Sequence, residues 1–510
     1  MKVRVRFAPS PTGALHIGGV RTALYNYLLA RQTGGTMILR IEDTDQQRFV
    51  PGAEQYILDA LAWAGIKLDE GVSVGGPYAP YRQSERKEIY RAHAQQLVDS
   101  GYAYYAFDTE EDLGEMRRKK PNAQYDASTR QQMKNSLTLP KDAVSSLLGN
   151  KPFVIRMLVS AGETIHLNDI IRGEVSVMSS QLDDKVLVKS DGMPTYHLAN
   201  VVDDRLMKIT HVIRGEEWLP SAPHHILLYR FFGWEAEMPR FAHLPLLLKP
   251  DGNGKLSKRD ADKMGFPIFP LNWTDPNSGE ASAGFREQGY LPWPLLNFLA
   301  LLGWNPGTEQ EIFTPEELVR SFSLDRVNKA GARFDIHKAQ WFNQRYLRTL
   351  PDEKLVGYLD EALNRTSASL WETTAAEPEK IRKIIAVLKD RVTFPGDFWE
   401  QGKLFFLAPT QYDEAAVSKK WTGEAAALLR EFQKEALADG HWTSEQAKNL
   451  FEITCARKRV KPGQVLAALR IALTGGLSGP DLMQTMEILG RQETTRRIGK
   501  ALEVLTVKTT

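Results

Sequence analysis

The first 45 residues hold the pattern that most limits what this chain can fold into. Residues 3–7, "VRVRF", alternate between apolar and charged side chains, which predicts a strand with one buried face. The glycine pair 34–35 ends a predicted helix, and "TMILRIEDTD" (36–45) predicts a buried strand that ends in carboxylates. Strand, loop, helix and strand in this order indicate a parallel α/β sheet. The apolar stripe of the helix consists of Val20, Ala23, Leu24, Tyr27 and Leu28.

The connection between the first strand and the helix, "APSPTGALHIGG" (8–19), has the character of a nucleotide-binding loop. It carries three glycines, two prolines and one imidazole, and it has no lysine and no carboxylate. Backbone N–H groups beside a helix N-terminus bind phosphate, because the helix dipole points at the same place. A Walker loop needs Lys and Ser or Thr where Gly19 and Val20 stand, and the dinucleotide spacing G-x-G-x-x-G is absent. The loop therefore predicts a nucleotide site of another design, built around His16.

Length and composition bound the other possibilities. A chain of 510 residues is too long for one core, so roughly three or four domains are expected. The net charge of +2 is too small to attract nucleic acid by itself, so any affinity for nucleic acid must come from local basic patches. The single cysteine, Cys455, excludes an internal disulfide and a cysteine-rich zinc cluster. No secretory signal and no apolar run of roughly 18–20 residues is present, so we expect a cytoplasmic protein without membrane contact.

A second motif, "GNGKLSKRD" (252–260), lies far along the chain and carries Lys255, Ser257 and Lys258. Taken alone, it is typical of a solvated basic turn. Together the two motifs have a family counterpart: "PSPTGALHIGG" resembles the HIGH motif of class I aminoacyl-tRNA synthetases in its glutamyl form, and "GNGKLSKRD" resembles their KMSKS loop. Gly19 stands at the fourth HIGH position, a departure that the glutamyl branch tolerates. The chain is thus similar to bacterial-type glutamyl-tRNA synthetases over nearly its whole length.

The resemblance implies an α/β fold class and a domain order. It predicts a HIGH-type Rossmann-like catalytic domain with an inserted acceptor-stem-binding domain, followed by an all-α anticodon-binding region. In that last region, Leu482, Met486 and Leu489 predict a stripe of core residues, in a helix expected to start at Pro480. The expected segments are 1–107 and 191–265 for the catalytic halves, 108–190 for the insertion, 266–330 for a stem-contact region and 331–510 for the helices.

The resemblance also implies the chemistry of the two motifs. A substrate carboxylate attacks the α-phosphorus of ATP and pyrophosphate leaves, so catalysis consists of positioning and electrostatic stabilisation. His16 and Lys258 are expected to hold the phosphates from two sides as catalytic residues, with help from Lys255, and Mg²⁺ is expected to accompany ATP. The expected ATP-binding residues are Pro9, Ser10, Pro11, Thr12, Gly13, His16, Gly18, Gly19, Lys255, Ser257 and Lys258.

An amino-acid pocket is expected at the carboxyl ends of the central strands. A glutamate side chain needs a fixed cation, and a guanidinium binds a carboxylate through paired hydrogen bonds. The resemblance implies that Arg6 and Tyr196 lie at the γ-carboxylate, that Arg214 also binds the substrate, and that Glu42 binds the α-amino group. The alternatives are a solvated strand face for Arg6 and a strand-end turn for Glu42. The full expected glutamate site is Arg6, Ala8, Ser10, Glu42, Tyr196, Asn200, Arg214, Glu217 and Trp218.

The predicted insertion lacks the ligands of a zinc site that some bacterial relatives carry. That site is built from Y-x-C-x-C and a downstream C-x-H. Here Ala106 and Asp108 replace the paired cysteines, and Thr129 and Gln131 replace the later ligands. Neither alanine nor threonine is a zinc ligand, so no zinc and no dedicated metal site is expected. The basic stretch "MRRKKPNAQ" (116–124) is either a tRNA contact or a solvated loop.

Two further regions have open roles. Residues 261–289 form a connection longer than the usual one of the family, and their prolines and glycines predict a surface loop. A gating role, a tRNA contact and a neutral loop are the alternatives for it. The basic clusters 455–464 and 491–500 are candidates for tRNA phosphate contacts, which position a tRNA without reading its sequence.

The implied activity is that of a glutamate–tRNA ligase. Such an enzyme makes glutamyl-adenylate from L-glutamate and ATP and transfers glutamate to the 3′-terminal adenosine of tRNA-Glu. The resemblance also implies use of the 2′-hydroxyl, a requirement for bound tRNA before activation, and a monomer. Three alternatives remain: a truncated relative that glutamylates a tRNA base, a nucleotidyltransferase acting on a small metabolite, and an inactive RNA-binding protein. The long helical region argues against the first two, and intact His16, Lys255 and Lys258 argue against the third.

Overall fold

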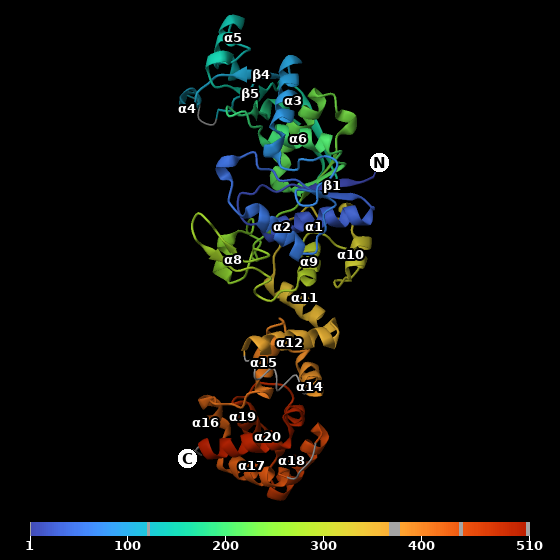
Figure 1. The fold of residues 1–510 in the computed structure, drawn as a ribbon, viewed down its shortest axis with the longest axis vertical. Helices are drawn as coiled ribbons and strands as arrows, with labels where there is room; N and C mark the ends of the chain where they lie inside the picture. The colour runs from blue at the N-terminus through green and yellow to red at the C-terminus, as the bar shows by residue number, and fades with distance from the viewer. Residues whose placement is uncertain (1, 120–122, 367–377, 438–441, 506–510) are drawn as a thin grey trace. The chain divides into compact units, whose positions relative to one another are not determined.

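The structure is a computed structural model that describes residues 2–119, 123–366, 378–437 and 442–505 (Figure 1). It contains two compact units, Met1–Ala339 and Gln340–Thr510. The first unit combines strands and helices, and the described elements of the second are helices. The five segments expected from the sequence divide the chain more finely than these units, and their limits stay predictions.

A five-stranded parallel sheet forms the centre of the first unit. Strand β1 lies in the middle of the sheet, and Val5 is opposite Met37 on one side and His211 on the other. All four pairings are parallel, which confirms the predicted parallel α/β sheet. The strands lie in the order β10 (Arg240–Leu244), β9 (His211–Gly215), β1 (Arg4–Phe7), β2 (Thr36–Leu39) and β3 (Glu70–Gly71).

Helix α1 (Ile17–Gln32) connects β1 to β2 as predicted, but it is buried on more than one side. Tyr27, assigned to the buried stripe from the sequence, is only half-buried, and Tyr25 is fully buried instead. The reason is a second layer of helices, because α9 (Pro292–Leu301) and α10 (Pro315–Ser321) also pack on α1. The Tyr25 hydroxyl donates to a backbone carbonyl of α9 at 2.9 Å.

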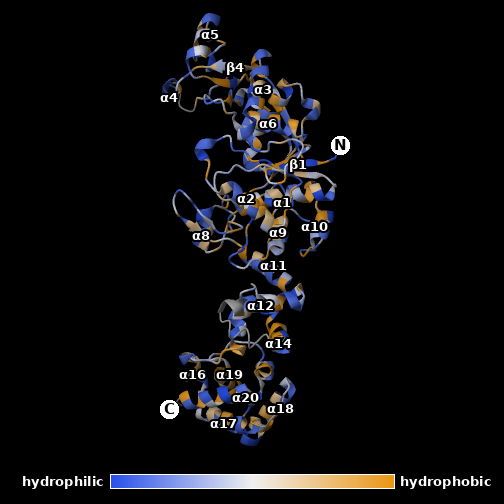
Figure 2. Cartoon of the chain, in the orientation of Figure 1, coloured by the Kyte–Doolittle hydropathy of each residue, from blue (hydrophilic) through white to orange (hydrophobic). Residues whose placement is uncertain are grey.

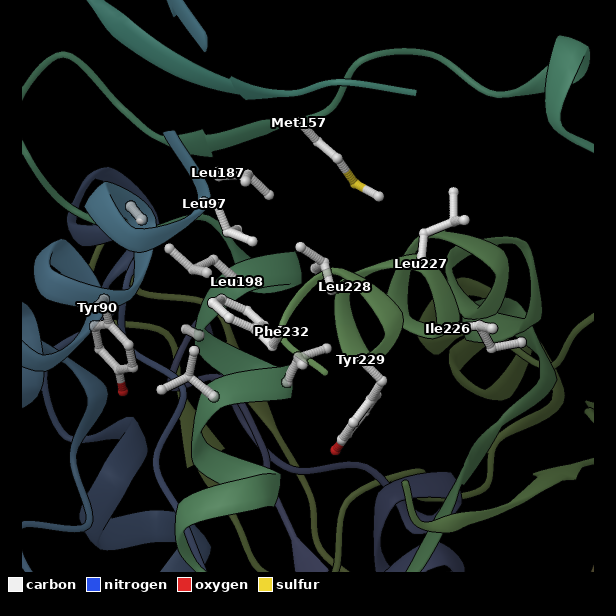
Figure 3. Close-up of a cluster of buried hydrophobic side chains, with 14 of the residues drawn as sticks. Tyr90, Leu97, Met157, Leu187, Leu198, Ile226, Leu227, Leu228, Tyr229 and Phe232 are labelled. Atoms are coloured by element: carbon white, nitrogen blue, oxygen red, sulfur yellow. The ribbon is translucent and has the colours of Figure 1, made fainter. Parts of the chain in front are cut away.

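A large hydrophobic core joins the central sheet to strands that lie between β3 and β9 in the chain (Figure 3). Three helices contribute to it: α3 (Lys87–Asp99), α6 (Tyr196–Leu206) and α7 (Ala222–Phe231). This shared core fixes α6 and α7 relative to the sheet, and both helices carry or border predicted site residues. The side chains labelled in Figure 3 are Tyr90, Leu97, Met157, Leu187, Leu198, Ile226, Leu227, Leu228, Tyr229 and Phe232.

The region between β3 and β9 contains two small antiparallel sheets. Figure 2 shows its helix α4 in hydrophilic blue, which agrees with the lack of any buried residue on that helix. Residues 116–119 of the predicted basic loop belong to α4, so that expectation is wrong for them, and residues 120–122 lie outside the described ranges. The elements are β4 (Ala103–Ala106), α4 (Glu110–Lys119), α5 (Lys141–Asn150), β5 (Val154–Met157), β6 (Thr164–Asp169), β7 (Gly173–Met178) and β8 (Val186–Val188).

Direct hydrogen bonds tie together the positions where a zinc site was considered. The Asp108 carboxylate accepts from the Tyr125 hydroxyl and from the Lys134 backbone N–H, both at 2.8 Å. The Thr129 hydroxyl donates to the Gln124 carbonyl at 2.7 Å. These contacts engage the side chains at two of the four replaced positions.

Residues 261–289 are more than the surface loop predicted for them. The segment contains the end of α8 (Lys258–Met264) and a short hairpin, β12 (Trp273–Thr274) with β13 (Ala281–Ser282). It also buries four large apolar side chains, which the many prolines and glycines of the segment did not predict. Those buried side chains are Phe266, Ile268, Leu271 and Phe285.

The second unit has a helical core of its own. Leu482, Met486 and Leu489 are buried, which confirms the predicted stripe. The helix begins after Asp481, whose carboxylate accepts from the N–H groups of residues 483 and 484, so Pro480 precedes the cap and does not start the helix. The described helices are α11 (Ile336–Thr349, which spans the unit boundary), α12 (Asp352–Thr366), α14 (Pro378–Leu388), α15 (Asp397–Gly402), α16 (Glu414–Lys420), α17 (Gly423–Ala436), α18 (Ser444–Lys458), α19 (Pro462–Thr474) and α20 (Leu482–Val504).

The remaining elements of the first unit are α2 (Ala53–Trp63) and a parallel pair of short strands, β11 (Leu247–Leu248) with β14 (Ala332–Arg333). The β11 strand precedes the lysine motif and anchors its start. Within the described ranges, no helix has both the length and the apolar character that crossing a bilayer requires.

Candidate active site

A cavity of about 490 Å³ opens at the carboxyl ends of β1 and β9. This is the usual position of a ligand site in an open parallel sheet. Of the described residues predicted to bind ATP, Pro11, Ser257 and Lys258 lie outside the cavity lining. The predicted residues that line it are Arg6, Ala8, Pro9, Ser10, Thr12, Gly13, His16, Gly18, Gly19, Glu42, Tyr196, Asn200, Arg214, Glu217, Trp218 and Lys255.

His16 caps the helix that starts at the cavity. Its Nδ1 accepts from the Gly18 N–H at 3.0 Å, so Nε2 carries the hydrogen of the neutral ring. A Cβ on Gly18 would lie 2.6 Å from Cε1 of the imidazole, which explains the glycine at this position. Close protein walls and the Lys255 cation lower the pKa of His16. A neutral imidazole with an N–H donor therefore stands beside the positive end of α1.

Away from His16, buried ion pairs hold the side chains of the cavity wall in place. Arg6 Nε donates to Asp204 at 3.0 Å, and Arg40 donates to the same carboxylate at 2.8 Å. Arg40 also donates to Glu42 at 2.9 Å, and the Asn200 amide donates to the same Glu42 oxygen at 3.0 Å. Because Arg6 is only 3% exposed, its alternative as a solvated strand face is wrong.

Burial and charge act in opposite directions on the two carboxylates of this network. Burial raises the pKa of Glu42 although Arg40 opposes that shift. Burial also acts to raise the pKa of Asp204, but Arg6 and Arg40 outweigh it, so the pKa is lowered. A cationic ligand group beside Glu42 would stabilise its charged form, as binding of an α-amino group requires.

A second carboxylate supports the network from behind. Asp203 accepts from Arg86 at 2.8 Å, from the Gln83 amide at 3.0 Å and from the Tyr90 hydroxyl at 2.7 Å. Its exposed fraction is 0%. Three arginines and three carboxylates therefore balance one another at this end of the sheet, and their side chains are held in place before any ligand arrives.

Arg214 also lines the cavity, beside Tyr196. Its Nη1 donates to the Tyr196 hydroxyl at 2.6 Å, and its Nε donates to His243 at 3.0 Å. Burial raises the pKa of Tyr196, so the phenol keeps its hydrogen and can donate it to a ligand carboxylate. The Tyr196 ring lies 4.4 Å from the Trp218 ring, centroid to centroid.

The lysine motif holds its two lysines on carboxylates. Lys255 lies 3.0 Å from Glu217 at the cavity, and Lys258 lies 2.9 Å from Glu280 on the hairpin of residues 273–282. Ser257 caps α8 together with Asp260 in a reciprocal capping box. The side chain of Ser257 is thus used by the helix, and Lys258 faces the hairpin.

The cavity offers no ready-made metal ligand set. Among residues 2–119, 123–366, 378–437 and 442–505, no group of three or more His, Cys, Asp or Glu side chains is arranged to hold a metal ion. The two carboxylates in the cavity wall, Glu42 and Glu217, already bind Arg40 and Lys255.

Comparison with known proteins identifies the family. Residues 2–341 match the catalytic domain of class I tRNA synthetases (E and Q), and residues 354–502 match an anticodon binding domain. A glutamate–tRNA ligase of Cytophaga hutchinsonii is 57% identical and covers 99% of this chain and 98% of its own length. The chain belongs to the class I glutamate–tRNA ligase family. A further member of this family, from Bacteroides fragilis, is 54% identical and covers 99% of both chains.

Solved structures of this family agree over the same length. A crystal structure of a glutamate tRNA ligase from Elizabethkingia meningosepticum, in complex with its amino acid, has a TM-score of 0.94 and 50% identity. It covers 99% of this chain and 100% of the other. A glutamate–tRNA synthetase from Elizabethkingia anophelis has a TM-score of 0.91 and 49% identity at the same coverage. The predicted family and fold class are thereby confirmed.

Several residues of the site were not predicted from the sequence. Arg40, Asp203 and Asp204 complete the buried ion network, and His243 binds Arg214. The doublet Asp203-Asp204 gave a signal, because two adjacent carboxylates in a helix with an apolar face seldom both face water. His243 gave none, since a lone histidine in a buried strand carries no pattern.

Proposed function

We propose that the cavity activates L-glutamate with ATP and that the enzyme then transfers glutamate to the 3′-terminal adenosine of tRNA-Glu. The observation that carries the proposal is the arrangement of the cavity. Two arginines, Arg6 and Arg214, line one end together with Tyr196, and the His16 cap of α1 lies at the other. A dicarboxylic amino acid and a triphosphate fit these two ends, because each finds charge of the opposite sign there.

In the first step, an oxygen of the substrate α-carboxylate forms a bond to the α-phosphorus of ATP. The bond from that phosphorus to the bridging oxygen breaks, and pyrophosphate leaves with the electron pair. His16 donates through Nε2 to a phosphate oxygen, and Lys255 and Lys258 stabilise the charge on the leaving group. Mg²⁺ arrives as part of the substrate MgATP and screens the phosphate charges. Lys258 must leave Glu280 to take part.

In the second step, a hydroxyl of the terminal adenosine attacks the carbonyl carbon of glutamyl-adenylate. The new ester bond forms, the bond to the phosphate oxygen breaks, and AMP leaves. Because the class I relatives use the 2′-hydroxyl, we propose the same position here. The helices of residues 354–502, which match an anticodon binding domain, would hold the tRNA at its other end, and the exposed cations of basic clusters 455–464 and 491–500 would contact its phosphates. Arg497 is excluded, because it is buried and binds Glu493 and two backbone carbonyls.

The two arginines also explain a choice of glutamate over glutamine. A glutamine amide cannot accept hydrogen bonds at both terminal atoms, so one buried donor of Arg6, Arg214 or Tyr196 would lack a partner. Such a loss costs about 1–3 kcal/mol for each unsatisfied group, and more for a charged one. We propose further that the enzyme acts as a monomer in the cytoplasm, where tRNA is charged for protein synthesis.

The test is pyrophosphate exchange into ATP, measured with glutamate or glutamine and with or without bulk tRNA. We expect exchange only when glutamate and tRNA are both present. Exchange with glutamine would overturn the roles of Arg6 and Arg214, and exchange with a small metabolite in place of glutamate would support a different nucleotidyltransferase. A complete lack of exchange, with tRNA still bound, would mean an inactive RNA-binding protein.

A further inference from the structure

Arg214 is held from behind by a buried pair that lies outside the cavity lining. His243 Nε2 accepts from Arg214 Nε at 3.0 Å, and His243 Nδ1 lies 2.6 Å from an oxygen of Asp169. Both side chains, His243 and Asp169, are 0% exposed. The contacts form one chain from Asp169 through His243 and Arg214 to the Tyr196 hydroxyl.

The fold brings these residues together from different parts of the first unit. Arg214 on β9 and His243 on β10 are direct partners across the parallel sheet. Asp169 is the last residue of β6, and its neighbour Ile170 donates a backbone hydrogen bond to Phe241 on β10 at 2.8 Å. The carboxylate therefore comes from the inserted strands and reaches the edge of the central sheet.

The two contacts of His243 fix its tautomer. Arg214 Nε is a donor only, so His243 Nε2 must accept and carries no hydrogen. Nδ1 therefore carries the hydrogen and donates it to Asp169. Burial lowers the pKa of His243. The hydrogen bond to Asp169 raises this pKa, and the neighbouring Arg214 and Arg172 cations lower it further, so the net shift is downward. The ring is neutral in this arrangement.

Asp169 has the right chemistry to hold that tautomer. Its second carboxylate oxygen accepts from the backbone N–H groups of Ile171 at 2.9 Å and Arg172 at 2.8 Å. Burial alone would raise the pKa of Asp169, but the hydrogen bonds from His243 and the backbone lower it. The residue is thus a fixed acceptor, and rotation of the carboxylate would break its backbone contacts.

We propose that His243 and Asp169 are positioning residues for the substrate carboxylate: they lock the plane of the Arg214 guanidinium through its Nε. Without His243, the Arg214 guanidinium is held only at its outer nitrogens, by the Tyr196 hydroxyl at Nη1 and by the Trp218 carbonyl, which lies 3.3 Å from Nη2. The bond at Nε adds an anchor on the opposite side of the group, next to the side-chain stem, and so fixes its plane. A fixed plane is what paired hydrogen bonds to a carboxylate require. The inference rests on the proposed function, because it assigns Arg214 to glutamate.

Two variants of one residue separate positioning from packing. H243N keeps an N–H donor at the Nδ1 position and satisfies Asp169, but it has no acceptor that reaches Arg214. H243Q places its amide oxygen at the Nε2 position, where it accepts from Arg214, while Asp169 loses its donor. We expect H243N to raise the KM for glutamate about 10- to 100-fold and leave the KM for ATP unchanged. We expect H243Q to stay within about 3-fold of wild type for both substrates.

The outcomes are measured by tRNA-dependent pyrophosphate exchange, with melting temperatures for each variant. Equal glutamate KM values for H243N and H243Q would overturn the proposal, as would a larger defect in H243Q. If wild type itself shows no glutamate-dependent exchange, the proposed function fails, which is a separate result from a failure of the two variants to differ.

A second comparison covers the case in which the histidine variants do not fold. In D169N, the amide oxygen must face the two backbone N–H groups, so the amide N–H₂ group faces His243 Nδ1. Nδ1 must then accept, and the imidazole hydrogen moves to Nε2, where it opposes the N–H of Arg214. The matched control is D184N, because Asp184 is another buried carboxylate of the first unit, and its hydrogen bonds go to Arg130 and Tyr104, not to Arg214. We expect D169N alone to raise the glutamate KM about 10-fold or more. Equal glutamate KM values in both variants would show a merely structural role.

Discussion

Lys258 Nζ lies 2.9 Å from Glu280 Oε2, so the second lysine of the "KLSKR" motif is held by the hairpin that follows it. The Glu280 side chain is 61% exposed and that of Lys258 is 30% exposed. Exposed ion pairs of this kind contribute about 0.2–1 kcal/mol, so the contact biases the position of the lysine without locking it. Through this contact, the long connection after the lysine motif touches a lysine that we propose to be catalytic.

Replacing Glu280 by glutamine should release Lys258 toward ATP. We expect E280Q to lower the KM for ATP by a factor of about 2–5, which corresponds to the small stability of an exposed pair. The measurement is pyrophosphate exchange at several ATP concentrations. The control is E309Q, an exposed glutamate elsewhere in the first unit. An ATP KM that rises in E280Q would instead mean that Glu280 helps to bind the nucleotide complex.

Removal of the Lys258 ammonium group should abolish most activity without harming the fold. We expect K258A to slow exchange about 10²–10³-fold, the usual effect of removing one donor to developing charge. The melting temperature and the affinity for tRNA should stay those of wild type, because the ion pair that the side chain forms with exposed Glu280 contributes little to stability. Full exchange activity in K258A would remove this lysine from the mechanism.

The stability of the first unit should fall in acid because of His197. Burial first, then the nearby His224 and Lys185, lower the pKa of His197 to about 3 from an ordinary value of 6.5. The neutral ring is therefore favoured in the folded state, and its stabilising effect is complete above pH 6.5 and is lost as the pH falls toward 3. Between pH 7 and pH 5 this residue alone should cost about 2 kcal/mol of unfolding free energy.

Urea unfolding at the two pH values tests that expectation on wild type and H197Q. The variant carries no titrating group at this position, so its loss between pH 7 and pH 5 should be smaller by about 2 kcal/mol. Equal losses in both proteins would mean that the acid sensitivity has another source.

The buried ion network should be sensitive to loss of a single charge. D204N leaves Arg6 and Arg40 short of one counter-charge, so we expect a loss of about 3–5 kcal/mol in unfolding free energy. The glutamate KM should rise as well, since Arg6 loses its anchor. The control E85Q removes an exposed partner of Arg82 and should change stability by less than about 1 kcal/mol. The free energies of unfolding of both variants are measured by chemical denaturation. Equal losses in D204N and E85Q would contradict the prediction.

The sequence predicted the local elements well, since alternation and helical spacing are local properties. It predicted the parallel order of β1 and β2 from the helix between them. The prediction was wrong where burial depends on distant segments. Tyr25 is buried in place of Tyr27, because α9 covers a second side of α1. Likewise, Phe266 and Ile268 are buried by contacts that no local pattern shows.

For the candidate site, the motifs indicated the residues that line the cavity but not those that hold them. Arg6 and Asp204 are 198 positions apart, and Arg214 and His243 meet only because β9 and β10 are neighbours in the sheet. A single sequence carries no trace of such pairings. The residues that line the cavity could be predicted from the family resemblance. The residues that hold them through hydrogen bonds and ion pairs became apparent only in the structure.

One backbone contact affects how this enzyme can be shortened. The N–H of Ile17, the first residue of α1, donates to the carbonyl of Ile268 at 2.9 Å. The segment after the lysine motif thus supplies an acceptor to the start of the helix that His16 caps. An engineer who trims this segment back to a minimal linker would delete part of the nucleotide site, although nothing in its composition marks it as such.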